Sequence, residues 1–335
     1  MAKLHYYWID WMKTIGMYFI VAGHLNPVGY TYIYVFSVPL FFIISGFLAK
    51  HEKNRNMFWQ KQWTNLILPC IVICLLMHIH DIMLGVVHGN FSWEDIPKHI
   101  FYCIIGEHGL GTGSGGLGMC WFIYTLVLCR ILYQYTFDKI VLRWLVVIVC
   151  LVVAIMYNRQ EIEVYNAVLN TSLAYPLYLF GGGGKFLYDN MRHPVAKTLI
   201  IVLFVISLTL VAVIGKLNGA PWMFGARYGN NLILFLIGGI AGTLAVFACS
   251  YLFQRFHCRG IDVISRGTII VLGFQFVLIE CYSHAPELFH GGLSEYVAAF
   301  IILVSFLPLI NFSEIYFPVL LGTRVLNRNE SINQL

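Results

Sequence analysis

The chain has 335 residues, of which 59% are hydrophobic and only 11% are charged. Its mean hydropathy of +0.76 excludes an ordinary soluble domain and predicts an integral membrane protein. The net charge of +5 is what basic cytoplasmic loops produce, so we expect no nucleic-acid partner.

Long apolar runs recur along the chain, and no shift in composition marks a second domain. We therefore expect one integral-membrane domain over residues 1–335, an all-α polytopic transmembrane helix bundle of about ten spans with a tail at 313–335. The expected spans are 9–27, 33–49, 64–87, 119–136, 143–158, 171–188, 198–215, 230–252, 268–284 and 294–312. The first residues lack the pattern of a cleavable signal peptide, so we expect the first span to insert the chain.

The basic residues predict how the bundle is oriented. An even number of spans places both termini on one side of the membrane. Of the 21 Lys and Arg residues, only Lys98, Arg159, Lys216 and Arg227 fall in loops on the opposite side. Because cytoplasmic loops are enriched in Lys and Arg, this bias predicts that both termini and the tail are cytoplasmic.

The first expected span carries polar side chains on one face. Lys13 and His24 lie eleven residues apart, which in a helix places them on one stripe, roughly 16 Å apart along the axis. Asp10 falls near the same stripe, one turn before Lys13. Because a cation and an imidazole are costly in lipid unless they face protein or water, the pattern predicts a polar track that binds an anion near Lys13 and transfers a proton at His24. The simpler alternatives are a snorkelling lysine and a helix-end histidine that meets lipid headgroups.

The second expected span is interrupted by helix-breaking and small residues. Pro39 frees a backbone carbonyl one turn earlier, and Ser45 and Gly46 follow near the end of the span. One interpretation is an ordinary kinked helix that packs through small residues. The other is that Ser37 and Ser45 line a cavity toward which His24 points.

These two segments resemble a known family. The pattern D-x-x-K-x-x-G-x-x-x-x-V-x-G-H, from Asp10 to His24, looks like the opening of the membrane acyltransferase-3 family. The segment from Phe36 to Phe47 is similar to that family's F-x-x-P-L-F-F-x-x-S-G-F/Y motif. The branch resembled most closely is the fucose 4-O-acetylase-like one. The strong match covers about residues 8–50. Weaker similarities follow at GMCWF (118–122) and in the turn before TIIVLGFQF (268–276).

The resemblance implies transfer of an acyl group, usually acetyl from acetyl-CoA, to a hydroxyl of a sugar, a surface glycan or a lipid-linked glycan. His24 would act as the general base or would first carry the acyl group. Lys13 would hold the phosphates of the donor or orient its thioester, with Asp10 setting its position. The resemblance also fits the bacterial cytoplasmic (inner) membrane as the location and membrane lipids as neighbours, and it leaves a homo-oligomer open.

Other residues are weaker candidates for the same site. Lys61 and Arg130 are expected to help bind the CoA phosphates, with snorkelling as the alternative for Arg130. Trp121 is a candidate for stacking on a sugar ring, and Glu107 for the acceptor site, where a solvated loop is the alternative. The chain departs from the family at two places where histidine is common, which are Ser37 and Gln275 here, and we expect these two side chains near the acceptor.

Two further expectations concern metals and a rival function. The nine cysteines show no CxxC or Cys/His spacing, so we expect them to be buried small hydrophobes and expect no metal. A proton-coupled small-molecule transporter that uses the Lys13–His24 stripe is the alternative to an acyltransferase.

Overall fold

The computed structural model describes residues 5–87, 89, 92–97, 100–101, 120–158, 166–190, 196–284 and 291–322. Its helices are α1 Tyr7–His24, α2 Tyr30–Tyr34, α3 Ser37–Phe47, α4 Arg55–Gln62, α5 Leu68–Val87, α7 Cys120–Thr136, α8 Ile140–Tyr157, α9 Asn166–Asp189, α10 Lys197–Asn218, α11 Leu232–Phe253, α12 Arg259–Arg266, α13 Thr268–Ser283 and α14 Ser294–Tyr316. Within these ranges the β structure is limited to one isolated bridge, Trp222–Arg227. The prediction of an all-α fold is therefore confirmed.

Each of the ten expected spans overlaps one of these helices. Six helical segments are long and apolar enough to cross a membrane, namely 30–47, 55–87, 140–157, 197–218, 232–253 and 294–316. A seventh is reached if α12 and α13, which meet at an angle of 88°, form one broken span. The chain is therefore an integral membrane protein, whereas the number of ten spans and the cytoplasmic location of the termini stay predictions.

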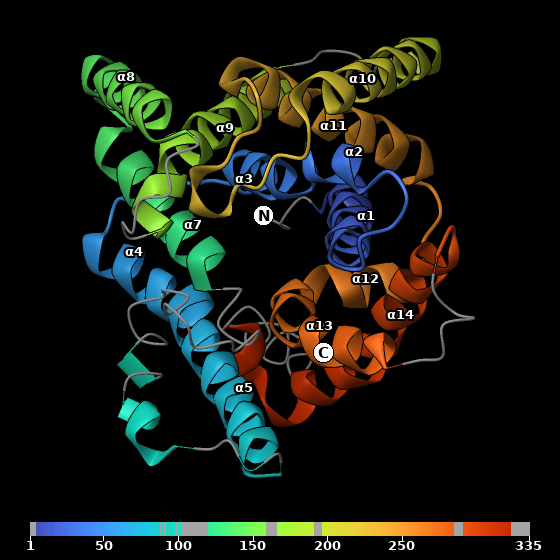
Figure 1. Cartoon of the computed structure of the whole chain (residues 1–335). Coiled ribbons are helices and arrows are strands. Elements are labelled where there is room, and N and C mark those ends of the chain that lie inside the picture. Colours follow the sequence, from blue (N-terminus) through green and yellow to red (C-terminus); the bar gives the residue numbers. More distant parts are fainter. Residues whose placement is uncertain are drawn as a thin grey trace, which may run out of the picture.

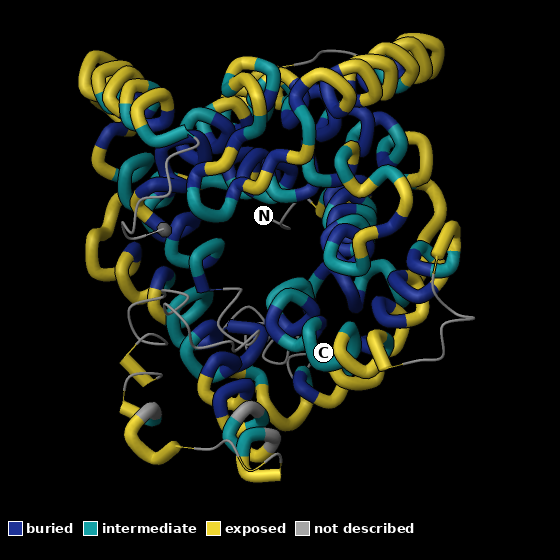
Figure 2. Tube along the Cα trace, in the orientation of Figure 1, coloured by how far each residue is buried: buried dark blue, intermediate teal, exposed yellow. Residues whose placement is uncertain are grey.

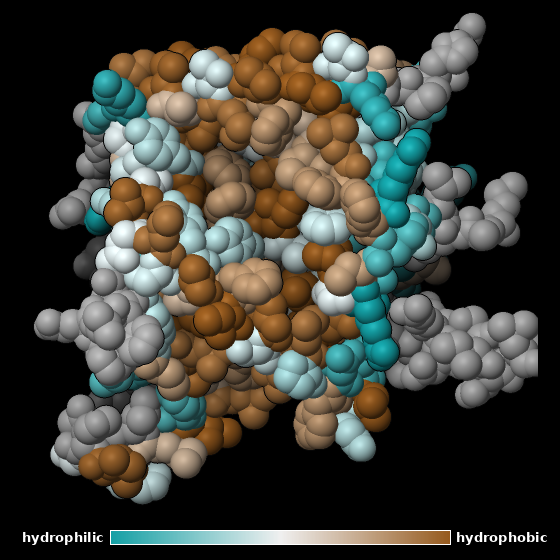
Figure 3. Space-filling model, turned by 90° about the vertical axis from the view of Figure 1, so that its right-hand side faces the viewer, coloured by the Kyte–Doolittle hydropathy of each residue, from teal (hydrophilic) through white to brown (hydrophobic). Residues whose placement is uncertain are grey.

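The surface has the distribution of hydropathy that a bilayer requires. In Figure 3 apolar side chains cover the broad middle of the face in view, and hydrophilic side chains gather along an edge of it. Helices α8 and α10 lie at the periphery of the bundle (Figure 1), and their outward faces are exposed (Figure 2). Their exposed residues are large and apolar, for example Val141, Leu145 and Ile201. This is the pattern of helices that face lipid.

Helices α1 and α3 are held in place by two kinds of packing, which are direct backbone contact and burial of apolar side chains. Helix α3 contacts α9 at backbone distance, because a Cβ on Gly46 would lie 1.8 Å from the carbonyl oxygen of Tyr178, and one on Gly181 would lie 2.0 Å from that of Ile43. Only glycine permits this approach, so the backbones of α3 and α9 pack directly against each other at Gly46 and Gly181. Gly183, two residues on, has no neighbour within 4 Å of such a Cβ.

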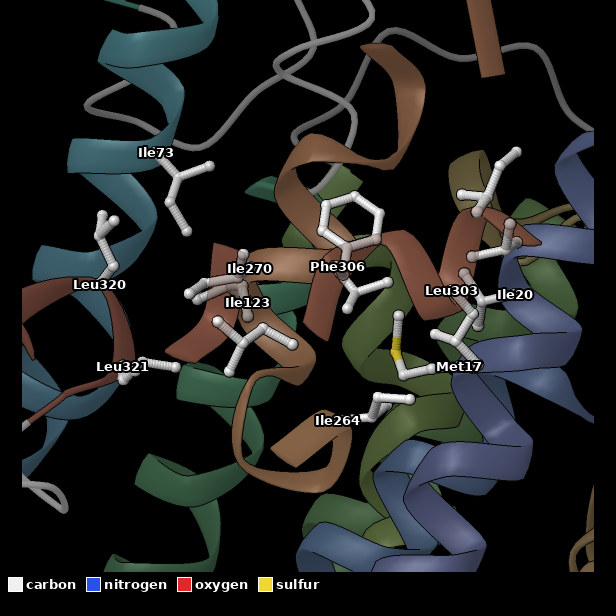
Figure 4. Close-up of a cluster of buried hydrophobic side chains, with 14 of the residues drawn as sticks. Met17, Ile20, Ile73, Ile123, Ile264, Ile270, Leu303, Phe306, Leu320 and Leu321 are labelled. Atoms are coloured by element: carbon white, nitrogen blue, oxygen red, sulfur yellow. The ribbon is translucent and has the colours of Figure 1, made fainter. Parts of the chain in front are cut away.

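A buried apolar cluster fixes α1 against the C-terminal helices. Figure 4 shows Met17 and Ile20 of α1 close to Leu303 of α14. The tail was expected to start at residue 313. The helical structure extends further, because α14 ends at Tyr316 and a short 3₁₀ turn follows at Pro318–Leu321. Burial of Leu320 and Leu321 in the same cluster explains why this segment is folded.

Candidate active site

A cavity of about 1120 Å³ lies inside the bundle. Its walls come from α1, α3, α7, α13 and the segment between α10 and α11, elements that surround the centre of the molecule in Figure 1. The residues expected at the site that line this cavity are Asp10, Lys13, His24, Ser37, Ser45, Trp121, Arg130 and Gln275. The lining does not include Lys61, whose Nζ lies 2.5 Å from the Glu52 carboxylate. Glu107 lies outside the described residues.

One end of the cavity is polar. The Asp10 carboxylate is buried, accepts a hydrogen bond from the Ser265 hydroxyl at 2.5 Å and lies 2.7 Å from Nε2 of His5. Lys13 follows one turn later on α1 and is half-buried. These contacts hold the first turns of α1 against the end of α12 and give this end of the cavity both signs of charge.

The break between α12 and α13 supplies further polar groups at this end. The Arg266 guanidinium donates to both carboxylate oxygens of Glu314, with Nε 2.5 Å and a terminal nitrogen 3.3 Å from them. Gly267 separates the two helices, where any Cβ would lie 2.4 Å from Ile310. Thr268 and Ile269 then line the cavity in the first turn of α13. The positive end of the α13 dipole therefore faces the cavity beside these charges.

The other end of the cavity is aromatic. The rings of His24 and Phe276 pack edge to face with centroids 4.8 Å apart. The Tyr34 hydroxyl donates to the carbonyl of Gly23 at 2.9 Å, which fixes the Tyr34 ring next to His24. Trp222 stacks on Tyr34 with centroids 5.8 Å apart and an interplanar angle of 16°.

The segment between α10 and α11, residues 219–231, is held rigidly at this end. Asn218 donates from Nδ2 to the carbonyl of Tyr228 at 2.9 Å and accepts from the Asn231 amide at 2.6 Å. The amide of Ala226 donates to Asn170 on α9 at 3.2 Å. These bonds position Trp222, and they also position Phe224, whose ring meets that of Trp121 at 5.9 Å.

Gln275 contributes a polar atom to this otherwise aromatic end. Its side chain is 0% exposed, and Nε2 donates to the carbonyl of Leu272 at 3.3 Å. Its Oε1 is buried and accepts no hydrogen bond from the described residues. A buried carbonyl oxygen in a cavity wall is costly unless a ligand or water donates to it, so Gln275 is suited to accept from a hydroxyl in the cavity.

Helices α1 and α13 run in the same direction along the cavity, because Asp10 meets Ser265 before α13 begins and His24 meets Phe276 near its middle. The helical rise places Lys13 and His24 roughly 16 Å apart along this wall. Arg130 lies nine residues after Trp121 on α7, roughly 13 Å away from the aromatic end. The cavity thus joins a polar, cationic end to an aromatic end that holds the imidazole.

Several lining residues were not expected from the sequence. Ser265 and Arg266 lie at the break at Gly267, Glu314 reaches the cavity from α14, and Trp222 reaches it through the segment 219–231. Asn65 also lines it, from the π-helical turn at Trp63–Ile67 that precedes α5. These residues lie at or beside interrupted helices, which are common at functional sites but which no local sequence pattern revealed.

Fold and site together define an integral membrane protein with an internal, two-ended cavity. The sequence model of the acyltransferase domain (Acyl_transf_3) matches residues 6–312, so the chain belongs to the acyltransferase-3 family and is a membrane acyltransferase. No curated protein and no solved structure matches the chain.

Proposed function

We propose that the protein moves the acetyl group of acetyl-CoA to a hydroxyl of a sugar or surface glycan, in the bacterial cytoplasmic membrane, as expected for the fucose 4-O-acetylase-like branch. The observation that carries the proposal is that Lys13 and His24 line one cavity, at its polar and aromatic ends. A donor with an anionic head and a thin arm, together with a ring-shaped acceptor, matches the two ends.

The polar end suits the phosphates of CoA. Lys13, Arg130 and Arg266 line it, and the positive end of the α13 dipole adds to their attraction for anions. At roughly 16 Å from His24, the Cα of Lys13 is too distant for its ammonium to share the reacting carbonyl with the imidazole. Of the two roles considered for Lys13, binding of the phosphates is therefore the better supported. Lys61 remains a candidate for contacts outside the cavity.

The aromatic end suits a sugar ring. The apolar face of a pyranose can stack on the Tyr34–Trp222 pair or on Trp121, and Gln275 Oε1 can accept from one of its hydroxyls. Ser37 and Ser45 on α3 add hydroxyls along the wall between the two ends. Glu107 stays a candidate for the acceptor.

The chemistry follows from a neutral His24. The imidazole takes the proton of the acceptor hydroxyl while the oxygen attacks the thioester carbonyl, and collapse of the tetrahedral intermediate expels the CoA thiolate, which leaves an acetyl ester. In the covalent variant the imidazole nitrogen attacks the thioester carbonyl first and expels the CoA thiolate. The acceptor hydroxyl then takes the acetyl group from the nitrogen, and its proton passes to the thiolate or to solvent. Both routes require His24 and the thioester to meet at the aromatic end.

The test is an assay of purified protein in detergent with acetyl-CoA labelled in the acetyl group and methyl α-L-fucopyranoside among other methyl glycosides. The proposal predicts that label moves to a glycoside, or that the thioester is cleaved in its absence. Intact acetyl-CoA, combined with proton-coupled solute uptake into liposomes without CoA, would instead support the transporter alternative.

A further inference from the structure

Three cysteine sulfurs that the acyl transfer does not use converge between α5 and α7. Sγ of Cys74 lies 2.9 Å from Sγ of Cys120, and Sγ of Cys70 lies 4.0 Å from the same atom. All three sulfurs lie within 4.8 Å of one another, and each residue is 0% exposed. Cys70 and Cys74 stand one turn apart on one face of α5, so a single point in space is within reach of all three thiols.

The spacing of the sulfurs matches coordination of one metal ion. Metal–thiolate bonds of about 2.3 Å place coordinated sulfurs roughly 3.8–4.0 Å apart in tetrahedral or trigonal arrangements. The Cys70–Cys120 separation of 4.0 Å equals this value, whereas the Cys74–Cys120 separation of 2.9 Å is shorter, so these two sulfurs would move apart when an ion binds. A disulfide would use only two of the three thiols and would need an oxidant.

The surroundings favour a soft ion that needs few ligands. The neighbours in the same buried cluster are apolar, among them Ile73, Met77 and Ile123, and Figure 4 shows Ile73 of α5 and Ile123 of α7 in this cluster. Thiolates bind both Zn²⁺ and Cu⁺ well. A zinc site needs a fourth ligand, whereas trigonal Cu⁺ needs only three sulfurs, which is the number that converges here among the described residues.

Metal binding requires the thiolate form of each cysteine, because the thiolate and not the thiol is the metal ligand. On binding, each Cu–S bond replaces an S–H bond and the protons leave to solvent, with no change in oxidation state.

We propose that Cys70, Cys74 and Cys120 form a binding site for a thiophilic monovalent ion, Cu⁺, which ties α5 to α7. None of the three cysteines lines the cavity, although Cys120 directly precedes Trp121, which does. Since α7 also carries Trp121 and Arg130, the ion would hold one wall of the cavity in place. The expectation of no metal rested on the lack of CxxC spacing, which does not detect ligands one helical turn apart that meet a third from a distant helix.

The test is titration of the reduced, purified full-length protein with Cu⁺ against a competing chelator, read by thiolate-to-copper absorption in the ultraviolet. The proposal predicts one tightly bound Cu⁺ per chain and a loss of roughly an order of magnitude or more in affinity for Cys74→Ser and Cys120→Ser, because one of three metal–sulfur bonds is gone. Cys129→Ser is the matched control, since Cys129 is equally buried on α7 but lies outside the cluster.

If the cluster variants fail to fold, the wild-type protein itself provides the test. X-ray absorption of the copper-loaded protein should then show three sulfur neighbours. Equal Cu⁺ affinity in the cluster variants and in Cys129→Ser would overturn the proposal, as would a Cys74–Cys120 disulfide in the isolated protein or preferential binding of Zn²⁺.

Discussion

Asp10 is the buried carboxylate of the polar end, and Ser265 is its hydrogen-bond donor across 255 residues of sequence. Ser265→Ala should lower the free energy of unfolding by about 1.5–3 kcal/mol, because a charged, buried acceptor loses one partner. Thermal unfolding of wild type and Ser265→Ala in detergent measures this loss of stability. Ser283→Ala is the control, since Ser283 is exposed and its hydrogen bonds are local, to Glu280 and His284; an equal effect of both changes would contradict the role given to Ser265.

Lys13 is expected to act on donor binding more than on the chemical step. Lys13→Ala should raise the Michaelis constant for acetyl-CoA about tenfold, equivalent to ~1.4 kcal/mol, while kcat changes little. Lys13→Arg should recover most of the affinity because it keeps the cation. The exposed Lys197 provides the control substitution, Lys197→Ala; a fall in kcat alone for Lys13→Ala would place Lys13 in the chemical step instead.

Three of the predicted residues that line the cavity could be placed together from the sequence. Asp10, Lys13 and His24 lie on one helical stripe, so periodicity alone predicts that they face the same side. Trp222 and Arg266 were not predicted, because the position of a loop or a helix break is set by tertiary contacts that no local pattern encodes. Arg266 is held by Glu314 on α14, and the segment that carries Trp222 is held through Ala226 by Asn170 on α9.

At the scale of the elements, the close contact of α3 and α9 places the wall that carries Ser37 and Ser45. Gly181→Ala should destabilise the protein by about 1–3 kcal/mol, because the new methyl group meets the backbone of Ile43. Gly183→Ala on the same helix is the matched control and should be neutral or stabilising by up to about 1 kcal/mol, since alanine favours helix and the site is open. Similar unfolding temperatures for the two variants would argue against the contact.

Helix existence was predictable, whereas helix interruptions were not. The ten apolar ranges all coincide with helices because hydrophobic length is a local property of the sequence. The 88° bend at Gly267 and the π-helical turn at Trp63–Ile67 depend on neighbours, such as Ile310 packed against Gly267. These interruptions bring Arg266 and Asn65 to the cavity, so the least predictable backbone is part of the site.

At the scale of the whole molecule, the predicted orientation gives the cavity a cytoplasmic polar end and an outward aromatic end. Two native cysteines test it, Cys258 before α12 and Cys281 in the last turn of α13. Both are exposed, so the expectation that the cysteines are buried is wrong for these two, because they lie at or beyond helix ends. A membrane-impermeant maleimide should label Cys281 in intact cells and Cys258 only after permeabilisation. Cys281→Ser and Cys258→Ser assign the two signals, and the reverse pattern would invert the orientation.

The central claim is that His24, at the aromatic end, carries out the acyl transfer. The most direct measurement is the rate of acetyl transfer from labelled acetyl-CoA by purified wild type, His24→Ala and His284→Ala, where His284 is an exposed histidine outside the cavity lining. The account predicts a fall of about 10²–10⁴-fold for His24→Ala, with unchanged unfolding temperature and a normal rate for His284→Ala. Full activity of a folded His24→Ala protein would contradict it.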